Sequence, residues 1–218
     1  MEPFQKEFIE FALAKHVLRF GEFTLKSGRI SPYFFNSGLF NDGETLAKLG
    51  HFYAAAIEHS DIDFDMLYGP AYKGIPLASA MSIALSYHFK KNMPFAFNRK
   101  EAKDHGEGGI IFGSKINGKA LIVDDVISAG TSIRESIDII TQEGGTVAAA
   151  IVAVDRQEKG QGETSAIQEV EQQFGFSIIS IINLEQIIAY ITENSNSEIG
   201  QYLDSIKDYK QRYGTIST

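Results

Sequence analysis

The sequence predicts an α/β fold in which helices flank a central, mainly parallel sheet. Short apolar segments alternate along the chain with segments whose apolar residues recur at helical spacing. Residues 121–123, L-I-V, form a continuous apolar run, which is typical of a strand buried on both faces. The 218 residues show no repeat, low-complexity tract or domain break. This length suffices for one core, so we expect a single domain over residues 1–218.

The first part of the chain predicts two helices and a hairpin. A helix is expected over residues 3–20, closed by Gly21, because its apolar side chains form a broad stripe. Residues 23–26 and 31–35 flank a Ser-Gly-Arg turn and predict the hairpin. A second helix follows Asp42. The later elements, in order, are expected as strand 64–68, helix 75–89, strand 95–98, strand 121–123, a helix to residue 143, strand 146–154, helix 165–174, strand 177–182 and two final helices.

Composition and charge exclude several classes of protein. The chain has no Cys, so it has no disulfide framework and no thiolate ligand or nucleophile. No basic-then-apolar leader opens the chain, and runs such as residues 178–182 are far shorter than the roughly 20 residues of a membrane span. The formal net charge of −8 argues against a nucleic-acid surface. We therefore expect a cytoplasmic protein that binds neither membrane nor nucleic acid.

The segment at residues 120–132, A-L-I-V-D-D-V-I-S-A-G-T-S, is the most informative. Ile133, Ile137 and Ile140 follow it at helical spacing, so its loop joins the carboxyl end of a parallel strand to the start of a helix. Open α/β sheets bind ligands at that edge, and a helix N-terminus offers N–H groups to an anion. The Gly-Lys spacing of a nucleotide-triphosphate P-loop is absent.

Two adjacent acids, Asp124 and Asp125, stand where this strand ends, which is where consecutive side chains can both face one ligand. Carboxylates beside a phosphate site can accept hydrogen bonds from the vicinal hydroxyls of a ribose. The loop adds small or hydroxyl-bearing residues, namely Ser128, Ala129, Gly130, Thr131 and Ser132. We interpret the segment as a sugar 5-phosphate site; the alternative is a helix-capping acid beside a solvated one.

A basic segment lies between two short apolar strands. Residues 99–109, R-K-E-A-K-D-H-G-E-G-G, bring together Arg99, Lys100, Lys103 and His105. A solvated hairpin tip has a similar composition. Beside a sugar-phosphate site, however, a flexible basic loop can close over a pyrophosphate and offset charge as it departs.

Two further segments are candidates for ligand contact. Residues 68–76, Y-G-P-A-Y-K-G-I-P, follow a strand and carry Lys73, which predicts either a second anion-binding loop or an ordinary turn with a surface lysine. Tyr33, Phe34 and Phe35 are consecutive, so they cannot all face inward from one strand. An exposed ring could form the wall of a site for a flat heterocycle, and Lys26 across the hairpin could meet an acidic substituent.

Four of these segments together resemble the bacterial orotate phosphoribosyltransferases, a branch of the type I phosphoribosyltransferases. They are F-T-L-K-S-G-R-I-S-P-Y-F-F-N-S-G from Phe23, G-P-A-Y-K-G-I-P from Gly69, N-R-K-E-A-K-D-H-G-E-G-G from Asn98, and the Asp124-Asp125 motif with the later D-R-Q-E-K-G. The resemblance covers nearly the whole chain. One position differs from many bacterial members, because Ser128 stands where they carry Thr. Serine keeps the hydroxyl and lacks only the methyl group.

The resemblance implies transfer of the 5-phosphoribosyl group of PRPP to N1 of orotate, with Mg²⁺ held mainly by PRPP and pyrophosphate and by no direct protein ligand. It implies catalytic roles for Arg99, Lys103, His105 and Asp125. The residues it implies for PRPP are Tyr72, Lys73, Arg99, Lys100, Lys103, His105, Asp124, Asp125, Val126, Ile127, Ser128, Ala129, Gly130, Thr131 and Ser132. Those it implies for orotate are Lys26, Phe34, Phe35, Ser128 and Arg156.

The resemblance also implies a small hood, formed by residues 22–36 and segments after residue 155, a flexible loop over residues 99–109, and a homodimer with shared active sites. Two other functions remain open. A PRPP-binding regulator of RNA or DNA would keep the phosphate site without catalysis, but it should show a basic face. A purine phosphoribosyltransferase would use PRPP with a different acceptor.

Overall fold

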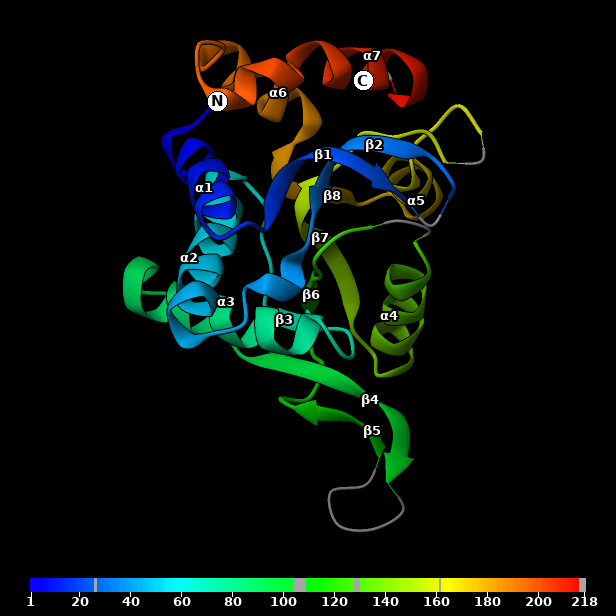
Figure 1. The fold of residues 1–218 in the computed structure, drawn as a ribbon. Helices are drawn as coiled ribbons and strands as arrows, with labels where there is room; N and C mark the ends of the chain where they lie inside the picture. The colour runs from blue at the N-terminus through cyan, green and yellow to red at the C-terminus, as the bar shows by residue number, and fades with distance from the viewer. Residues whose placement is uncertain (26, 104–108, 128–129, 161, 216–218) are drawn as a thin grey trace.

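The computed structural model describes residues 1–25, 27–103, 109–127, 130–160 and 162–215, with the backbone alone for residues 102 and 103. Figure 1 labels its helices and strands along the chain. The elements are α1 (Pro3–Ala14), β1 (Leu18–Thr24), β2 (Ile30–Phe35), η1 (Ser37–Leu39), α2 (Gly43–His59), β3 (Met66–Gly69), α3 (Gly74–Phe89), β4 (Phe95–Lys103), β5 (Gly109–Gly113), β6 (Lys119–Val123), α4 (Thr131–Gln142), β7 (Thr146–Asp155), α5 (Ala166–Phe174), β8 (Ser177–Asn183), α6 (Leu184–Glu193), η2 (Glu198–Tyr202) and α7 (Leu203–Tyr213).

Six of the strands form one sheet in the order β5-β4-β3-β6-β7-β8, and β1 and β2 form a separate antiparallel hairpin. Every neighbouring pair from β4 to β8 is parallel, whereas β5 runs antiparallel to β4. Strand β6 lies inside the sheet between β3 and β7. The predicted α/β fold, with a mainly parallel sheet and the residue 121–123 strand in its interior, is therefore confirmed.

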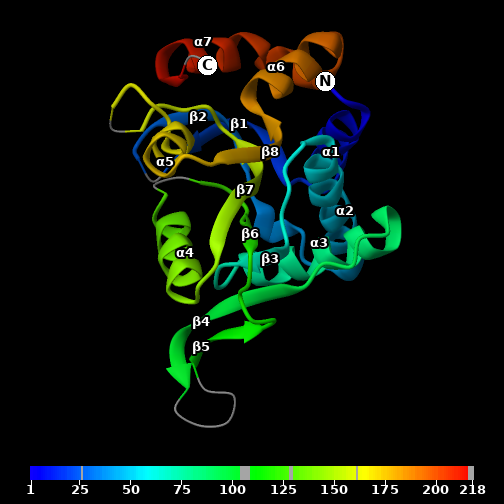
Figure 2. The ribbon, with the colours of Figure 1, turned by 180° about the vertical axis from the view of Figure 1, so that it is seen from behind.

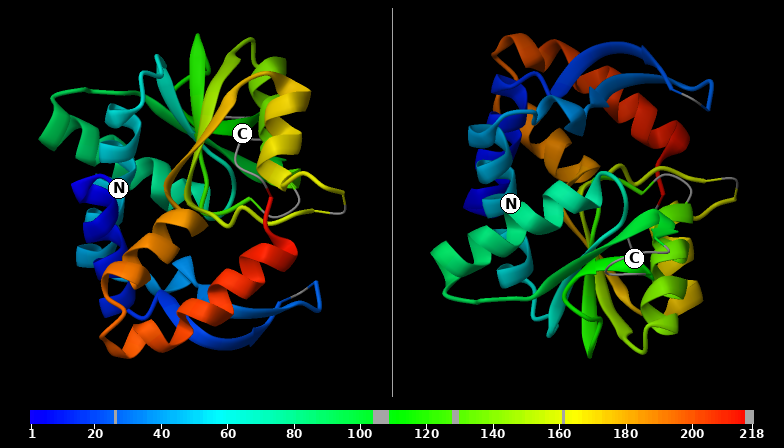
Figure 3. Two further views of the ribbon diagram at one scale, coloured as in Figure 1. Left: turned by 90° about the horizontal axis from the view of Figure 1, so that it is seen from above. Right: turned by 90° about the horizontal axis from the view of Figure 1, so that it is seen from below.

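Helices cover both faces of this sheet. Figure 3 shows α1, α2 and α3 on one side and α4 and α5 on the other. The alternation of side chains along β6 serves both layers: Leu121 and Val123 belong to the core beneath α2 and α3, while Ala120 and Ile122 belong to the core beneath α4. All four side chains are fully buried, which explains why this strand has a continuous apolar sequence.

The first helix ends earlier than the sequence pattern predicts. Helix α1 stops at Ala14, His16 adopts a left-handed φ of 56°, and β1 begins at Leu18, so residues 18–20 are strand, not helix. Leu18 pairs with Phe35 in β2 and is buried. Leu18 continues the helical spacing of the apolar residues in α1, but this agreement is a coincidence. Its conformation is decided by pairing with a later segment of the chain. Gly21 lies within β1, at a register shift, and does not close the helix.

The segment predicted as a loop at residues 99–109 is partly strand. Strand β4 continues to Lys103 because β5 pairs with it, with partners from Ala96 and Gly113 to Lys103 and Gly109. The resulting β4–β5 hairpin projects beyond the body of the molecule in both Figure 1 and Figure 2. Arg99 and Lys100 therefore stand on a projecting strand, and only residues 104–108 of the predicted loop lie outside the described part.

The hairpin of β1 and β2 packs beside the last helices, as Figure 1 shows. Phe20 of β1 stacks on Tyr202, with ring centroids 5.7 Å apart. Tyr33 of β2 meets Tyr209 of α7 edge to face, with centroids 6.3 Å apart. These aromatic contacts join the two ends of the chain at one end of the molecule. No helix among the described residues is both long enough and apolar enough to cross a membrane.

Candidate active site

Two buried carboxylates mark the carboxyl end of β6. The whole residues Asp124 and Asp125 are 7% and 5% exposed. Asp124 accepts hydrogen bonds from the backbone N–H of Asp125 at 2.9 Å and from the hydroxyl of Ser132 at 3.0 Å. Burial raises the pKa of Asp124 to about 6, and the adjacent charge of Asp125 acts in the same direction. The strand end thus holds the two acids together, as predicted.

Asp125 is held by two donors from different parts of the chain. Its Oδ2 accepts a hydrogen bond from Ser37 Oγ at 2.6 Å and lies 2.5 Å from the ammonium of Lys73. Ser37 begins η1, directly after the β2 segment that carries Phe34 and Phe35. Lys73 stands just before α3. Asp125 therefore connects the segment after β2 with the turn before α3 that carries Lys73. The sequence pattern places that turn at the same edge of the sheet.

A pocket of about 250 Å³ opens between this strand end and α4. Its walls include Asp124, Val126, Ile127, Gly130, Thr131, Ser132 and Ile133. The cap residue of α4 is Gly130, with a φ of 70°, and a glycine has no side chain that could accept a hydrogen bond from the first turn of the helix. A Cβ at Gly130 would come within 2.7 Å of Arg134 Nη1. The helix thus presents its first N–H groups and its dipole to a ligand of negative charge.

The turn after β3 packs too closely for side chains at its glycines. A Cβ at Gly74 would lie 2.4 Å from Pro70 Cδ and 2.7 Å from the carbonyl oxygen of Val123. The turn is joined to β4 by a 2.9 Å hydrogen bond from the N–H of Ala71 to Asn98 Oδ1. The ammonium of Lys100 lies 5.0 Å from the ring centroid of Tyr72. Two of the side chains predicted to contact PRPP, Tyr72 and Lys100, thus meet within one chain.

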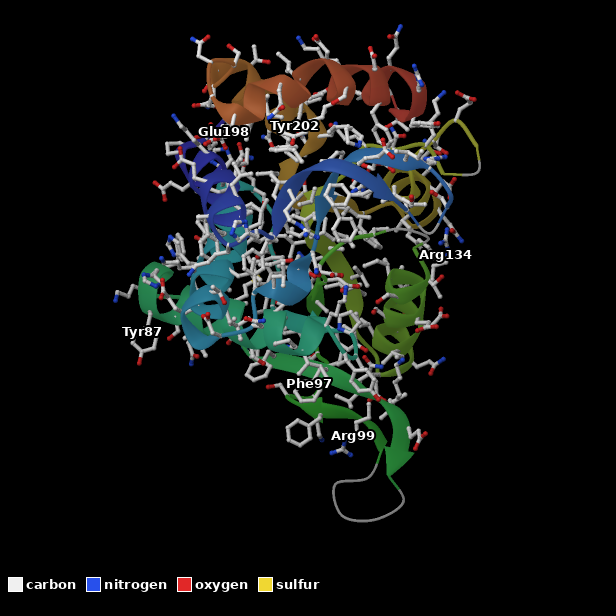
Figure 4. All side chains as sticks on the ribbon, viewed as in Figure 1. Tyr87, Phe97, Arg99, Arg134, Glu198 and Tyr202 are labelled. Atoms are coloured by element: carbon white, nitrogen blue, oxygen red, sulfur yellow. The ribbon has the colours of Figure 1, made fainter. Side chains whose placement is uncertain are left out.

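Arg99 lies on the projecting hairpin. Its guanidinium stands 5.3 Å from the ring centroid of Phe112 on β5. Figure 4 shows Arg99 and Phe97 together at this end of the molecule. Arg99 thus lies against β5 of the hairpin, whereas Lys73 contacts Asp125.

The hairpin β1–β2 meets the segment after β7. The guanidinium carbon of Arg156 lies 4.4 Å from the ring centroid of Tyr33, and its Nη2 donates to Ser31 Oγ at 3.2 Å. Arg156 Nε also donates to Glu158 at 2.8 Å. Arg156 is thus brought to β2, the strand that carries the predicted aromatic wall. The side chain of Arg156 is 21% exposed and is paired with Glu158.

The three consecutive aromatics of β2 have different surroundings. Tyr33 is fully buried. Phe35 is partly buried and packs near Phe8, with ring centroids 6.3 Å apart. Phe34 stacks on Phe23 at 5.5 Å, with Arg19 at 5.9 Å from its ring centroid. As expected for a strand, the three do not share one environment.

Some predicted residues lie outside the described part of the chain: Lys26, His105, Ser128 and Ala129 do so entirely, and Lys103 does so for its side chain. Two side chains at the site were not singled out from the sequence. Ser37 contacts Asp125, and Glu158 contacts Arg156. The signal for each was its place within a recognised motif, since Ser37 belongs to the segment that starts at Phe23 and Glu158 belongs to D-R-Q-E-K-G.

Comparisons with known proteins agree with this geometry. The model of the phosphoribosyl transferase domain family matches residues 39–178. The orotate phosphoribosyltransferase of Cronobacter sakazakii is 56% identical over 214 residues, which cover 98% of this chain and all of that protein. The protein of the same name from Klebsiella pneumoniae gives the same values. The chain belongs to the orotate phosphoribosyltransferase family.

A solved structure of this family extends the likeness to the fold. The orotate phosphoribosyltransferase of Francisella tularensis matches with a TM-score of 0.87 at 44% identity, covering 96% of this chain and all of that one.

Proposed function

We propose that this chain transfers the 5-phosphoribosyl group of PRPP to N1 of orotate, giving orotidine 5′-monophosphate and pyrophosphate, in pyrimidine (UMP) biosynthesis. The observation that carries the proposal is the pair of buried carboxylates, Asp124 and Asp125, beside a helix N-terminus whose cap is a glycine. Acids there suit the hydroxyls of a ribose, and the helix end suits its 5-phosphate. The orotate phosphoribosyltransferase relatives specify the acceptor.

Catalysis in this proposal rests on positioning and charge. The transition state resembles a ribosyl cation from which the polyanionic pyrophosphate departs. Preorganised charged groups therefore stabilise it better than a covalent nucleophile would. The residues from Asp124 to Ser132 hold the ribose 5-phosphate, and Tyr72 and Lys73 face the pyrophosphate. The remaining positive charge around the pyrophosphate comes from the segment of the β4–β5 hairpin that carries Arg99, Lys100, Lys103 and His105.

Mg²⁺ accompanies PRPP in this proposal. Among the described residues, no three His, Asp or Glu side chains are grouped as a metal site would require. Asp125 Oδ2 is already occupied by Ser37 and Lys73. We propose that the ion is held mainly by the oxygens of PRPP, where it would neutralise the departing pyrophosphate.

Orotate would lie between the hairpin and the segment after β7. Phe34 and Phe35 supply an apolar wall, Lys26 and Arg156 supply positive charge, and Ser128 supplies a hydroxyl. The proposal is supported by the contact of Arg156 with β2 through Ser31.

The acceptor can be tested directly. Pyrophosphate release from PRPP should depend on orotate and should not be supported by adenine or hypoxanthine. Release with a purine would instead identify a purine phosphoribosyltransferase. Binding of PRPP without release in the presence of any of the three bases would favour a PRPP-binding regulator.

Arg156→Lys is expected to weaken orotate binding by about 1.5–3 kcal/mol, the scale of a hydrogen bond to a charged group. Lysine keeps the charge but loses the planar fork that pairs with a carboxylate. Titration calorimetry with orotate, and separately with PRPP, provides the measurement. PRPP affinity should be nearly unchanged, and an unaltered orotate affinity would remove Arg156 from the orotate site.

We also propose a homodimer in which the tip of the basic hairpin reaches the neighbouring subunit's site. The β4–β5 hairpin projects from the body of the molecule, which suits contact with a second copy (Figure 1). An apolar groove of about 350 Å³ lies between α2 and α3. Two of its lining residues, Ile83 and Tyr87, are 61% and 75% exposed, and Figure 4 shows Tyr87 pointing outward. Apolar surface of this kind suits burial between subunits.

Hybrid dimers provide the test of shared sites. An inactive Asp125→Asn chain and an inactive Lys103→Ala chain, unfolded and reassembled together, should regain some activity, because one site of the hybrid recovers both groups. Differently tagged chains allow the heterodimers to be isolated. Isolated heterodimers that remain inactive would rule out sharing across the interface.

The domain and the compartment are likewise proposed. We propose that residues 1–218 form one domain, which is supported by one apolar cluster that includes Phe8 of α1, Leu121 of β6 and Tyr209 of α7. The hood in this proposal is the β1–β2 hairpin with the segments after residue 155. A cytoplasmic location suits a biosynthetic enzyme of this family.

A further inference from the structure

A cluster of partly buried charged and aromatic side chains surrounds Arg156, and its acid has no role in the reaction described above. Glu158 Oε1 accepts from Arg156 Nε at 2.8 Å and lies 2.6 Å from Nη2. One carboxylate oxygen of Glu158 thus contacts two nitrogens of the Arg156 guanidinium. The contacts to Glu158 and Ser31 engage Nε and Nη2 and do not involve Nη1, and Tyr209 of α7 also lies close to both Arg156 and Glu158.

Glu158 is itself held in place, unlike an ordinary surface acid. Its side chain is 13% exposed. Its backbone pairs with Gly214 after α7, and the neighbouring Lys159 N–H donates to the carbonyl of Tyr213 at 2.8 Å. Tyr33 donates from its hydroxyl to Glu158 Oε1 at 3.4 Å. Burial raises the pKa of Tyr33 well above its ordinary value, so this hydroxyl remains protonated and can donate.

A second cation lies near the same acid. Arg29 Nη1 is 3.9 Å from Glu158 Oε2, and it donates to the carbonyl of Lys159 at 2.9 Å. Its guanidinium also stands 4.9 Å from the ring centroid of Tyr213. The side chains of Arg29, Glu158 and Arg156 together carry a net charge of +1, which one substrate carboxylate would neutralise. Arg29 therefore offsets the repulsion that Glu158 would exert on that carboxylate.

We propose that Glu158 is a positioning residue that holds Arg156 by its Nε–Nη2 edge against Tyr33 and leaves Nη1 for the carboxylate of the pyrimidine substrate. The proposal rests on the proposed function, in which Arg156 meets orotate. A guanidinium fixed on one edge by a carboxylate and on one face by a ring loses little freedom when a ligand binds. Glu158 thus acts through Arg156 and does not contact the reacting atoms.

Steady-state kinetics of Glu158→Ala and Glu158→Gln test this role. Glu158→Ala should raise KM for orotate about tenfold, a coupling of ordinary size for contacting residues. KM for PRPP should change less than about twofold, since the phosphoribosyl side of the site is untouched. Glu158→Gln keeps an acceptor oxygen for Nε and should rescue most of the loss. Its similar shape also keeps the test informative if the alanine variant does not fold.

Glu163→Ala is the matched control. Glu163 lies five residues further along and pairs with Lys159, but its side chain is 89% exposed. It should leave KM for both substrates unchanged, because an exposed pair of this kind contributes little. A loss of orotate affinity in this variant equal to that of Glu158→Ala would show that any charge change in the segment has the effect, and it would overturn the proposal.

The double variant Arg156→Lys/Glu158→Ala separates positioning from general stabilisation. If Glu158 acts through Arg156, its removal should raise KM for orotate less than about twofold further when Arg156 is already replaced. An equal factor in both backgrounds would assign Glu158 to the fold alone. A lower KM for orotate in Glu158→Gln would show instead that the acid competes with substrate. Either result contradicts the proposal.

A wild-type chain that releases no pyrophosphate with orotate would refute the proposed function itself. An active wild type whose Arg156→Lys variant keeps its KM for orotate would leave the reaction intact and refute both the assignment of Arg156 and the positioning role of Glu158.

Discussion

Lys103→Ala is expected to lower kcat about 10²- to 10³-fold, the usual cost of removing one group that stabilises charge in the transition state. The backbone of Lys103 lies at the end of β4 on the projecting hairpin, paired with Gly109, away from the two apolar cores. The melting temperature should therefore move by less than about 2 °C. Steady-state kinetics and thermal unfolding of the same preparations provide the measurements.

Lys115→Ala is the control for this prediction. Lys115 follows β5 and is a lysine outside the predicted site, so its removal changes the net charge equally. It should leave kcat unaltered. Normal turnover together with a lowered melting temperature in Lys103→Ala would mean that Lys103 supports the hairpin and not the reaction.

Asp124→Asn is expected to stabilise the protein and impair its use of PRPP. The carboxyl pKa is raised from 3.8 to about 6 by burial. Between these values the folded chain binds more protons than the unfolded chain, so the free energy of unfolding falls as pH rises from about 4 to about 6 and stays lower above that. The shift corresponds to roughly 1–3 kcal/mol at pH 8. An asparagine does not ionise and should recover this amount.

The hydrogen bonds of Asp124 allow the substitution. An asparagine oxygen can accept from the Asp125 N–H, and its amide can donate to Ser132 after the hydroxyl turns. The loss of charge should lower kcat/KM for PRPP about 10- to 100-fold, because a hydroxyl bonds less strongly to a neutral amide than to a carboxylate.

Chemical denaturation at pH 8 and at pH 4.5 measures the stability effect. The Asp124→Asn variant should exceed the wild type in unfolding free energy at pH 8, with a smaller difference at pH 4.5. Asp125→Asn is the control, and it should bring no gain because Asp125 is paired with Lys73 and Ser37. A stability difference for Asp124→Asn that does not change with pH would contradict the assigned ionisation.

Much of the site could be predicted from the sequence because its parts are local. The acids follow a strand that is apolar on both faces, and the glycine and hydroxyls follow the acids, so one segment specifies a strand end, a loop and a helix start. Lys73 could be placed at the same edge because it also follows a strand. Its 2.5 Å contact with Asp125 could not, since it depends on β3 lying next to β6.

The first strand shows where sequence patterns fail. Residues 18–20 continued the helical spacing of α1, yet they pair with β2. The strand at residues 95–98 likewise extends to Lys103 because β5 folds back onto it. In both cases the hydrogen bonds that decide the conformation come from a separate segment. A short apolar run does not indicate which segment will pair with it.

By itself, the sequence determined the α/β class, the order of most elements and the position of the phosphate loop. These features depend on the periodic spacing of apolar residues and on turn residues, which are properties of neighbouring positions. The tertiary structure alone decided which side chains share a contact: Ser37 with Asp125, Tyr72 with Lys100, and Arg156 with Tyr33 and Glu158. Apart from Arg156 with Glu158, which are two residues apart, these pairs join segments that are distant in the sequence, so their geometry exists only once the sheet and hairpin have packed.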